Sequence, residues 1–399
     1  KFLLMITIDN FSYAGQRALV RVDFNVPLNE AKKVTDDTRI RAALPTLKKI
    51  VADGGKAVVM SHLGRPKGKD LTSSLKPVAQ YLQGLVDCPV HFASDCIGEA
   101  AIKAVEEADF GSIILLENVR FYEEETQGAF DFASQLAVLG DCYVNDAFGT
   151  AHRAHASTTI VAGLFRGKSA FGYLMAKELE SLDKIFKDGQ KPVTAVVGGA
   201  KVSSKISILE NLLDKVDNII IGGGMAFTFV KAQGGKVGSS LVEEDFLDTA
   251  NQICKAAAEK GVSILLPSDA INANGFSNEA ETIKTAINEI PDGWMGLDIG
   301  AESIERFSDC IAKSKTILWN GPLGVFEMES FAKGTIELGN AIDAATKNGA
   351  FSLVGGGDSV AAVKQFGFAD KVSYVSTGGG AMLESLEGKT LPGIEAILK

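Results

Sequence analysis

The sequence predicts an α/β protein made of two lobes. Each lobe is expected to be Rossmann-like and three-layered, with a mostly parallel sheet between helices. Two observations predict this fold. Short β-branched apolar runs alternate with longer amphipathic segments along the chain, which is typical of parallel sheets. The 399 residues are also enough for two or three domains, each with its own core.

The apolar runs predict ten strands, four in the first lobe and six in the second. They lie at residues 18–26, 56–60, 113–118 and 141–145, and then at 193–197, 218–221, 262–266, 316–319, 351–354 and 371–375. Nearly every run ends in a polar or glycine-rich turn. Ligands of open α/β sheets bind at the carboxyl ends of the strands. We therefore expect one binding site on each sheet.

Residues 173–188 predict a helix that connects the lobes. They contain no Gly or Pro, and Met175, Leu179, Leu182 and Phe186 recur at helical spacing. A helix defines a hinge better than a flexible Gly/Ser linker does. We expect domains at residues 1–172 and 189–385, with 173–188 as the hinge helix.

Composition and charge exclude several classes of function. The net charge of −10 disfavours a nucleic-acid partner, since such proteins usually carry a basic footprint. No apolar run approaches the ~18 residues of a membrane span. The apolar stretch at residues 2–8 is short and has no cleavage site, so we do not expect a signal peptide. The five scattered cysteines form no C-x-x-C pair, which favours reduced thiols and a cytoplasmic location.

Arginines and glycine runs are divided between the two halves of the chain. Eight of the nine arginines precede residue 167, whereas all three Gly-Gly-Gly runs follow residue 221. Arginine binds carboxylate or phosphate through a planar fork of donors. Glycine runs let backbone N–H groups surround a phosphate at a helix start. The first half is predicted to bind a small anion, and the second a nucleotide.

The turns of the first lobe supply the side chains that a small molecule with a phosphate and a carboxylate would need. Each is expected at a strand end or just after one. They are Asp23, Asn25, Arg39, His62, Arg65, Arg120 and Arg153. The alternative is that each arginine is a surface charge, which is harder to accept for four in succession. His152 and His155, three residues apart, could bind a metal, although no third ligand with suitable spacing accompanies them.

The second lobe has three strand–glycine–helix turns. Gly198-Gly199-Ala200-Lys201 is expected to open a helix at residues 202–216, with Lys205 one turn further on the same face. Gly355-Gly356-Gly357-Asp358-Ser359 repeats the pattern, and residues 378–380 give the third turn. The Asp358 carboxylate suits Mg²⁺, a cation usually shared with substrate phosphates; the alternative is a helix N-cap. Glu327 is a candidate for the ribose hydroxyls or a plain surface carboxylate.

Nine segments together resemble the phosphoglycerate kinase family across nearly the whole chain. They are RVDFNVPL (residues 21–28), SHLGRPKG (61–68), LLENVRF (115–121), NDAFGTAHRAHAS (145–157), VVGGAKVSSKI (196–206), GGGMAFTF (222–229), WNGPLGVFE (319–327), VGGGDS (354–359) and STGGGAMLE (376–384). The resemblance implies a two-lobed kinase that interconverts ATP plus 3-phosphoglycerate with ADP plus 1,3-bisphosphoglycerate.

The resemblance also assigns roles to residues. The 3-phosphoglycerate site would comprise Asp23, Asn25, Arg39, His62, Arg65, Arg120 and Arg153. The nucleotide would contact Lys201, Lys205, Gly296, Glu327, Gly356, Gly357, Asp358 and Ser359, with Asp358 toward the Mg²⁺ that accompanies ATP or ADP. The tail at residues 386–399 would pack back on the first lobe.

For the chemistry we expect Arg39 and Lys201 to flank the transferring phosphoryl group. The backbone N–H groups of Gly357 and Gly379 would cradle it, and closure about the hinge helix would bring the two ligands together. A monomer is expected from one two-lobed chain. Two other classes stay open at this point, a nicotinamide-dependent dehydrogenase and a non-catalytic nucleotide-binding module. The first lacks an early G-x-G-x-x-G motif, and the second leaves the arginines of the first lobe unexplained.

Overall fold

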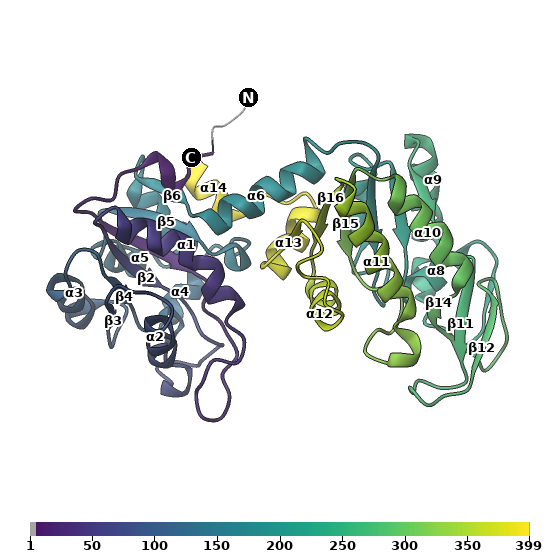
Figure 1. Ribbon diagram of the computed structural model, residues 1–399, viewed down its shortest axis with the longest axis horizontal. Helices are drawn as coiled ribbons and strands as arrows, with labels where there is room; N and C mark the ends of the chain where they lie inside the picture. The colour runs from purple at the N-terminus through teal and green to yellow at the C-terminus, as the bar shows by residue number, and fades with distance from the viewer. Residues whose placement is uncertain (1–4, 399) are drawn as a thin grey trace. The chain divides into compact units, whose positions relative to one another are not determined.

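The computed structural model describes residues 5–398 and divides the chain into two compact units (Figure 1). Unit 1 comprises residues 1–179 and 390–399, and unit 2 comprises residues 180–389. The division falls within helix α6 (Tyr173–Phe186), which ends two residues before the predicted limit. Part of the apolar stretch at residues 2–8, and the last residue of the predicted tail, lie outside the described residues.

Unit 1 is built on a six-stranded sheet in the order β3-β4-β2-β1-β5-β6, with every neighbouring pair parallel. Its strands are β1 (Arg17–Val22), β2 (Lys56–Met60), β3 (Val90–Phe92), β4 (Ile113–Leu115), β5 (Cys142–Asp146) and β6 (Ser169–Phe171). Strands β2, β4 and β5 are buried along their whole length, as apolar runs covered on both faces require.

The helices of unit 1 cover this sheet with amphipathic faces. They are α1 (Thr38–Ala52), α2 (Lys76–Gln83), α3 (Gly98–Glu107), α4 (Glu123–Gln127), α5 (Phe130–Ala137) and the C-terminal α14 (Pro392–Leu398). In α1 the residues Ile40, Ala43, Leu47 and Ile50 are buried at helical spacing and enter the main core. The C-terminal helix packs on unit 1, where the Gly393 N–H donates to the Ala151 carbonyl at 2.9 Å.

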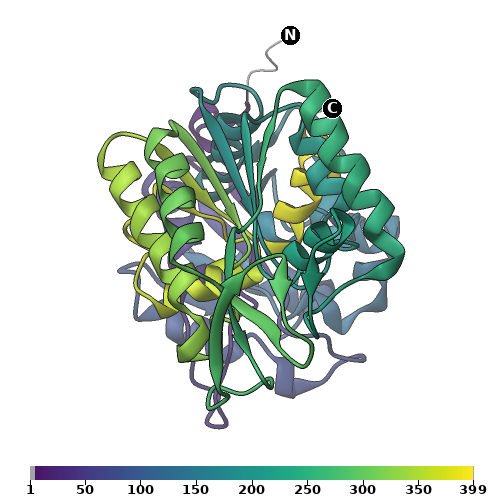
Figure 2. The same ribbon diagram turned by 90° about the vertical axis from the view of Figure 1, so that its right-hand side faces the viewer.

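Unit 2 repeats the design with a parallel sheet in the order β10-β8-β7-β15-β16-β17. Its strands are β7 (Val193–Val197), β8 (Asn218–Ile221), β10 (Ser263–Leu265), β15 (Thr316–Asn320), β16 (Phe351–Val354) and β17 (Tyr374–Val375). The helices are α7 (Ile206–Leu212), α8 (Met225–Ala232), α9 (Leu247–Lys260), α10 (Ala301–Lys313), α11 (Lys333–Lys347), α12 (Gly357–Gln365) and α13 (Gly379–Leu386). Figure 2 shows α9 on one side of this sheet, with α10 and α11 on the other.

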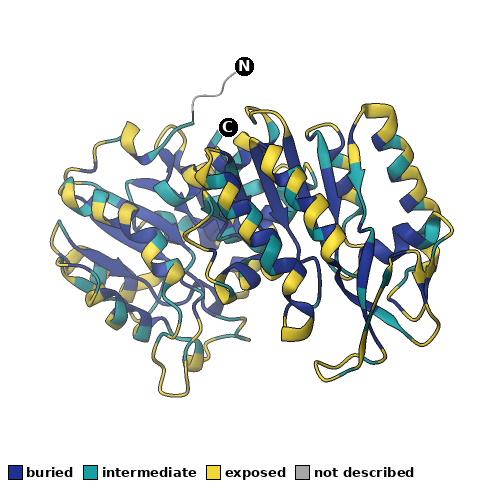
Figure 3. Cartoon of the chain, turned by 45° about the vertical axis from the view of Figure 1, so that its right-hand side comes forward, coloured by how far each residue is buried: buried dark blue, intermediate teal, exposed yellow. Residues whose placement is uncertain are grey.

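Unit 2 also contains two small sheets that the sequence analysis did not predict. Strands β11 (Asp269–Ala273), β12 (Thr282–Ala286) and β14 (Met295–Ile299) form an antiparallel sheet, and β9 (Lys236–Val237) pairs with β13 (Glu289–Ile290). Figure 3 shows the common pattern of both units, in which the central strands are buried and the helices expose their outer faces. The predicted α/β class with mostly parallel sheets is confirmed.

Within the described residues, no helix combines the length and apolar character that crossing a membrane requires.

Candidate active site

A cavity of about 290 Å³ in unit 1 brings together all seven residues predicted for the anion site. It lies at the carboxyl ends of β4, β2, β1 and β5, which are neighbours in the sheet. The lining residues are Asp23, Asn25, Arg39, His62, Gly64, Arg65, Arg120, Gly149, Thr150 and Arg153. Adjacent parallel strands place their following turns at one edge of the sheet, so residues far apart in the sequence meet there.

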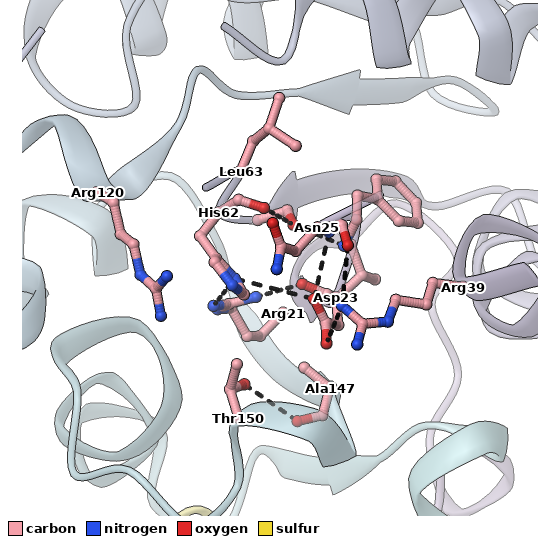
Figure 4. Close-up of polar contacts among 12 residues, drawn as sticks. Arg21, Asp23, Asn25, Arg39, His62, Leu63, Arg120, Ala147 and Thr150 are labelled. Atoms are coloured by element: carbon pink, nitrogen blue, oxygen red, sulfur yellow. Dashed lines mark hydrogen bonds and ion pairs between the residues drawn. The ribbon is translucent and has the colours of Figure 1, made fainter. Parts of the chain in front are cut away.

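Arg39 is held against the turn that follows β1 (Figure 4). The Nη1 atom of Arg39 donates to the Asn25 carbonyl at 2.9 Å and lies 3.3 Å from Asp23 Oδ2. Asn25 Oδ1 in turn accepts from the Gly64 N–H at 2.9 Å, which joins the turns after β1 and β2. The placement of Arg39 at a strand end was wrong: it lies in the first turn of α1, where Asp23 and Asn25 draw its side chain to the cavity.

Arg120 contributes a positive charge that the protein leaves only partly satisfied. It is 9% exposed, its Nη1 donates to the Gly64 carbonyl at 2.7 Å, and its Nε is buried without a hydrogen-bond partner. Burial, followed by the charges of Arg21 and Arg153, lowers the pKa of this guanidinium to about 10. An anion in the cavity would relieve this repulsion.

His62 is neutral at physiological pH. It is 4% exposed, and burial followed by the charges of Arg21, Arg120, Arg39 and Arg153 holds its pKa well below the usual range. In the described part of the chain, no three His, Cys, Asp or Glu side chains are grouped so that they could hold a metal ion. The metal alternative for His152 and His155 therefore has no third ligand in the structure either.

A second cavity, of about 520 Å³, lies within unit 2 and has a different lining. Backbone from the turns after β7, β8 and β15 forms one wall, and apolar side chains such as Phe227, Leu241 and Phe276 form much of the rest. Three of the predicted nucleotide residues line it: Gly296, Glu327 and Asp358. An apolar cavity with a few polar groups at its edge is suited to a planar base with a charged extension.

Comparison with known proteins decides the family. A family model described as "Phosphoglycerate kinase" matches residues 8–389. The chain belongs to the phosphoglycerate kinase family. The phosphoglycerate kinase of Porphyromonas gingivalis is 55% identical and is covered over its whole length by 98% of this chain. That of Gloeothece citriformis is 52% identical, with 98% of both chains covered.

Solved structures agree with this assignment. The phosphoglycerate kinase of Coxiella burnetii superposes with a TM-score of 0.90 at 42% identity, and that of Pyrococcus horikoshii with 0.81 at 30% identity. Each comparison covers 98% of this chain and 98% of the other. The chain is therefore a kinase, a phosphotransferase by class.

Lys201 and Lys205, two phosphate-binding candidates of this kinase, both precede the helix, although the prediction placed Lys205 within it. The helix expected at residues 202–216 is only α7 (Ile206–Leu212), so the prediction was wrong at both ends. Ser203 hydrogen-bonds to Glu243 through its N–H and hydroxyl, and Ser204 Oγ donates to the Lys201 carbonyl. The bond of Ser204 is local and competes with helix formation, and Glu243 holds Ser203 from a distant part of the chain. Lys201 is exposed and Lys205 is the residue before α7, so the two do not share a helix face.

Lys205 is more closely held than Lys201. Its Nζ donates to Asn320 Oδ1 at 2.6 Å, at the end of β15. Burial lowers its pKa, while the neighbouring charges of Asp358 and Glu387 act in the opposite direction. Lys201 and Lys205 are absent from the lining of the cavity in unit 2, and their contact with a nucleotide stays a prediction.

The two later glycine turns meet at their helix starts. Gly356 precedes α12 with a φ of 95°, a left-handed conformation that glycine adopts without strain. A Cβ added to Gly379, at the start of α13, would lie 3.9 Å from the Gly357 nitrogen. Ser359 is buried, and its hydroxyl accepts from the Gly321 N–H at 2.5 Å, so it links two turns. The nucleotide contacts of Gly356, Gly357, Gly379 and Ser359 stay predictions.

The donor set of unit 2 fits a magnesium ion that is carried by a nucleotide. Asp358 is exposed in the first turn of α12, at the edge of the cavity and close enough to Lys205 to affect its pKa. Mg²⁺ commonly takes one or two protein carboxylates together with substrate phosphates. Asp358 alone meets that requirement, and the N-cap alternative is wrong because Gly356 occupies the N-cap position.

Arg21, Asn320 and Asp298 were not predicted as parts of either site. Arg21 and Asn320 are fully buried, and Asp298 lines the cavity of unit 2. Arg21 could have been noticed because a charged residue interrupts the apolar strand at residues 17–22. Asn320 carries a similar signal as the polar last residue of β15. Asp298 carries no such signal, because the sequence GLDIG around it does not indicate which groups its carboxylate contacts.

Proposed function

We propose that this chain catalyses the reversible transfer of the γ-phosphoryl group of ATP to the carboxylate of 3-phosphoglycerate, the glycolytic reaction named by its family. The observation that carries the proposal is the cavity of unit 1. Its eight polar side chains include four arginines, which suits a small ligand bearing a phosphate and a carboxylate. The apolar, glycine-walled cavity of unit 2 is proposed to bind the adenine nucleotide.

The chemistry requires no general base. The nucleophile is a carboxylate oxygen, which has a pKa near 4 and is ionised at neutral pH. It forms a bond to the γ-phosphorus while the bond from that phosphorus to the β,γ-bridging oxygen breaks, and ADP leaves with the electron pair. No proton moves. The barrier is repulsion between anions, about 4 kcal/mol for one pair of unit charges 4 Å apart at an effective dielectric constant of 20.

The protein would lower this barrier by neutralising charge and by positioning the ligands. Arg39 and Lys201 are proposed to flank the transferring group, and the N–H groups of Gly357 and Gly379 to receive its oxygens. Arg65, Arg120, Arg153 and His62 would hold the acid substrate. Mg²⁺ held by Asp358 would neutralise charge on the phosphate oxygens of the bound nucleotide.

The reacting atoms must come within about 3–3.5 Å, although the two cavities belong to different compact units. We propose that residues 1–172 with the tail at 386–399 form the acid-binding domain and residues 189–385 the nucleotide-binding domain. Closure about the hinge helix at residues 173–188 would then assemble the site. We also propose that the enzyme is a monomer, and X-ray scattering with both ligands and with neither is the test of closure. Equal radii of gyration would contradict closure.

A coupled assay tests the activity itself. Complete mixtures contain 3-phosphoglycerate, ATP and Mg²⁺, and each component is then omitted in turn. We expect turnover only in the complete mixture, and ADP formation without 3-phosphoglycerate would contradict the proposal. A non-catalytic nucleotide-binding module would give no turnover in any mixture.

A further inference from the structure

A fully buried arginine lies directly beneath the cavity of unit 1. Arg21, on β1, has 0% exposure, so its side chain has no surface open to a ligand in the cavity. Its guanidinium donates to three uncharged acceptors: Ser157 Oγ at 2.8 Å, the Val22 carbonyl oxygen, and His62 Nδ1 at 3.2 Å. Figure 4 shows Arg21 beside the His62 ring.

The contact between Arg21 and His62 determines where the histidine carries its proton. A guanidinium has five donors and no acceptor, so His62 Nδ1 must accept with a lone pair. The ring is then neutral, and its single proton is on Nε2. Asp23 Oδ1 lies 3.9 Å from the same Nδ1, too far for a hydrogen bond, so it does not favour the other tautomer.

The orientation of Arg21 is itself fixed by a buried pair. Ser157 Oγ donates to Glu125 Oε1 at 2.6 Å, and the Ser157 N–H donates to Glu125 Oε2 at 2.9 Å. Both residues have 0% exposure. Because the hydroxyl proton is directed at Glu125, the lone pairs of Ser157 Oγ are left to accept from Arg21 Nε. Arg21 therefore donates on both sides, to His62 on one and to Ser157 on the other, and Ser157 donates onward to Glu125.

We propose that Arg21 is a positioning residue that, anchored by Ser157 and Glu125, holds His62 as the neutral tautomer whose Nε2–H is available to an anion in the cavity. The identity of that anion rests on the proposed function; the tautomer does not. An imidazolium would carry a proton on Nδ1, and that proton would face the donors of Arg21. The positive charges around the ring, Arg21 on β1, Arg39 on α1, Arg120 and Arg153, oppose the imidazolium further, and Asp23 is the facing carboxylate.

Nitrogen-15 NMR of the unliganded wild-type enzyme tests the tautomer directly. The chain has only four histidines, so the loss of one signal in His62→Gln assigns the residue. We expect the His62 spectrum to show a protonated Nε2 and an unprotonated Nδ1, unchanged between pH 6 and 8. A proton on Nδ1, or an imidazolium at pH 7, would overturn the proposal without any variant of Arg21.

Two variants test the chain of contacts. In Arg21→Met the ring loses its donor, and we expect His62 to populate both tautomers and to titrate. The KM for 3-phosphoglycerate should rise about tenfold or more, the usual effect of one hydrogen bond to a charged group, with a smaller change in kcat. Ser157→Ala removes only the hydroxyl that accepts from Arg21 Nε. It should change the His62 tautomer and the KM in the same direction as Arg21→Met, but by less.

The control is Arg166→Met, which makes the same replacement at an exposed arginine of unit 1. It should leave the His62 spectrum and the KM unchanged. An Arg21→Met enzyme that folds, with a wild-type His62 spectrum, would refute the positioning role. If the wild-type spectrum is as expected but the coupled assay shows no turnover, the proposed function fails and the tautomer assignment stands.

Discussion

The two units use the same parallel-sheet architecture to make cavities of opposite character. The cavity of unit 1 is small and its polarity comes from side chains, four of them arginines. The cavity of unit 2 is larger and combines apolar side chains with glycine backbone. In both, many lining residues follow the carboxyl ends of neighbouring strands, although Arg39 reaches the cavity of unit 1 from α1. The sheet therefore determines where a ligand binds, and the residues of the turns determine which ligand it is.

The comparison extends to what each cavity can do for the reaction. Charged side chains in unit 1 can neutralise an anion but must be held in place, as Asn25 holds Arg39 and Gly64 holds Arg120. Backbone N–H groups in unit 2 are held by the fold itself, in turns where some glycines, such as Gly198 and Gly223, leave no room for a Cβ. Substitutions in the cavity of unit 1 should therefore change mainly its charge. Substitutions in the cavity of unit 2 should change its shape as well as its charge.

The largest effect is expected from removing the charge of Arg39. Arg39→Ala should lower kcat by about 10³-fold or more, by analogy with arginines that stabilise the transition state of phosphoryl transfer. Binding of 3-phosphoglycerate should weaken less, because the other arginines of the cavity remain. Steady-state kinetics with both substrates varied gives the two values.

Arg41→Ala is the matched control for Arg39. Arg41 lies on the same helix with a 59% exposed side chain, and it pairs with Asp37 instead of the cavity residues. Its kcat should stay near the wild-type value. A fall of less than tenfold in Arg39→Ala would remove this residue from the transition state.

A smaller effect is expected from the carboxylate of unit 2. Asp358→Ala should raise the KM for MgATP by about 10–100-fold, the equivalent of one charge-assisted interaction, while the KM for 3-phosphoglycerate changes little. The exposed Asp370 of the same unit provides the control, Asp370→Ala. Equal changes in both KM values would show that Asp358 does not serve the nucleotide alone, and would weaken the division of roles between the units.

The sequence predicted the central strands, and it predicted that seven polar side chains of unit 1 lie together. Val193–Val197 and Phe351–Val354 are buried apolar runs, and the structure forms β7 and β16 at those same residues. The seven residues of unit 1 could be predicted to meet because parallel strands end at one edge of the sheet. Their hydrogen-bond partners could not, since Arg39 reaches the cavity from a helix and not from a strand turn.

The parts that sequence reasoning missed depend on contacts between distant segments. Strands β3 and β6 have only three residues each, and neither lies within a longer apolar run like those at residues 113–118 and 262–266. The loss of helix around residues 202–205 depends on Glu243, which lies forty residues away along the chain. The buried chain from Glu125 to His62 likewise joins four separate elements, and no local motif indicates it.

A third prediction addresses the shape of the cavity in unit 2. A Cβ at Gly296 would lie 2.2 Å from the Phe227 ring, so Gly296→Ala requires the ring or the strand to move. We expect a loss of about 1–3 kcal/mol in stability, typical of overpacking, together with weaker nucleotide binding. Gly275→Ala is the control because an added Cβ there meets nothing within 4 Å. Thermal unfolding and nucleotide titration measure the two effects, and equal stability of both variants would refute the close packing.

A fourth prediction concerns one buried carboxyl in each unit, Asp146 and Asp298. Burial raises the pKa of each to about 7, against the hydrogen bonds that the carboxylates accept from Met175 and Gly334. Between the unfolded value near 4 and this folded value the native state binds more protons than the unfolded state. Stability should therefore fall as pH rises through this window, by about 1.4 kcal/mol per pH unit for each group at most.

Asparagine at either position keeps the shape of the side chain and removes the titrating carboxyl. Asp146→Asn should therefore flatten the pH dependence of the stability of unit 1, and Asp298→Asn that of unit 2. Urea unfolding at pH 5 and pH 7 measures the slopes, and a fluorophore attached to an exposed residue of each unit separates them. Because the two carboxyls belong to different units, each variant should alter the slope of its own unit and leave the other unchanged. A change in both slopes from one substitution would mean that the two units do not unfold independently.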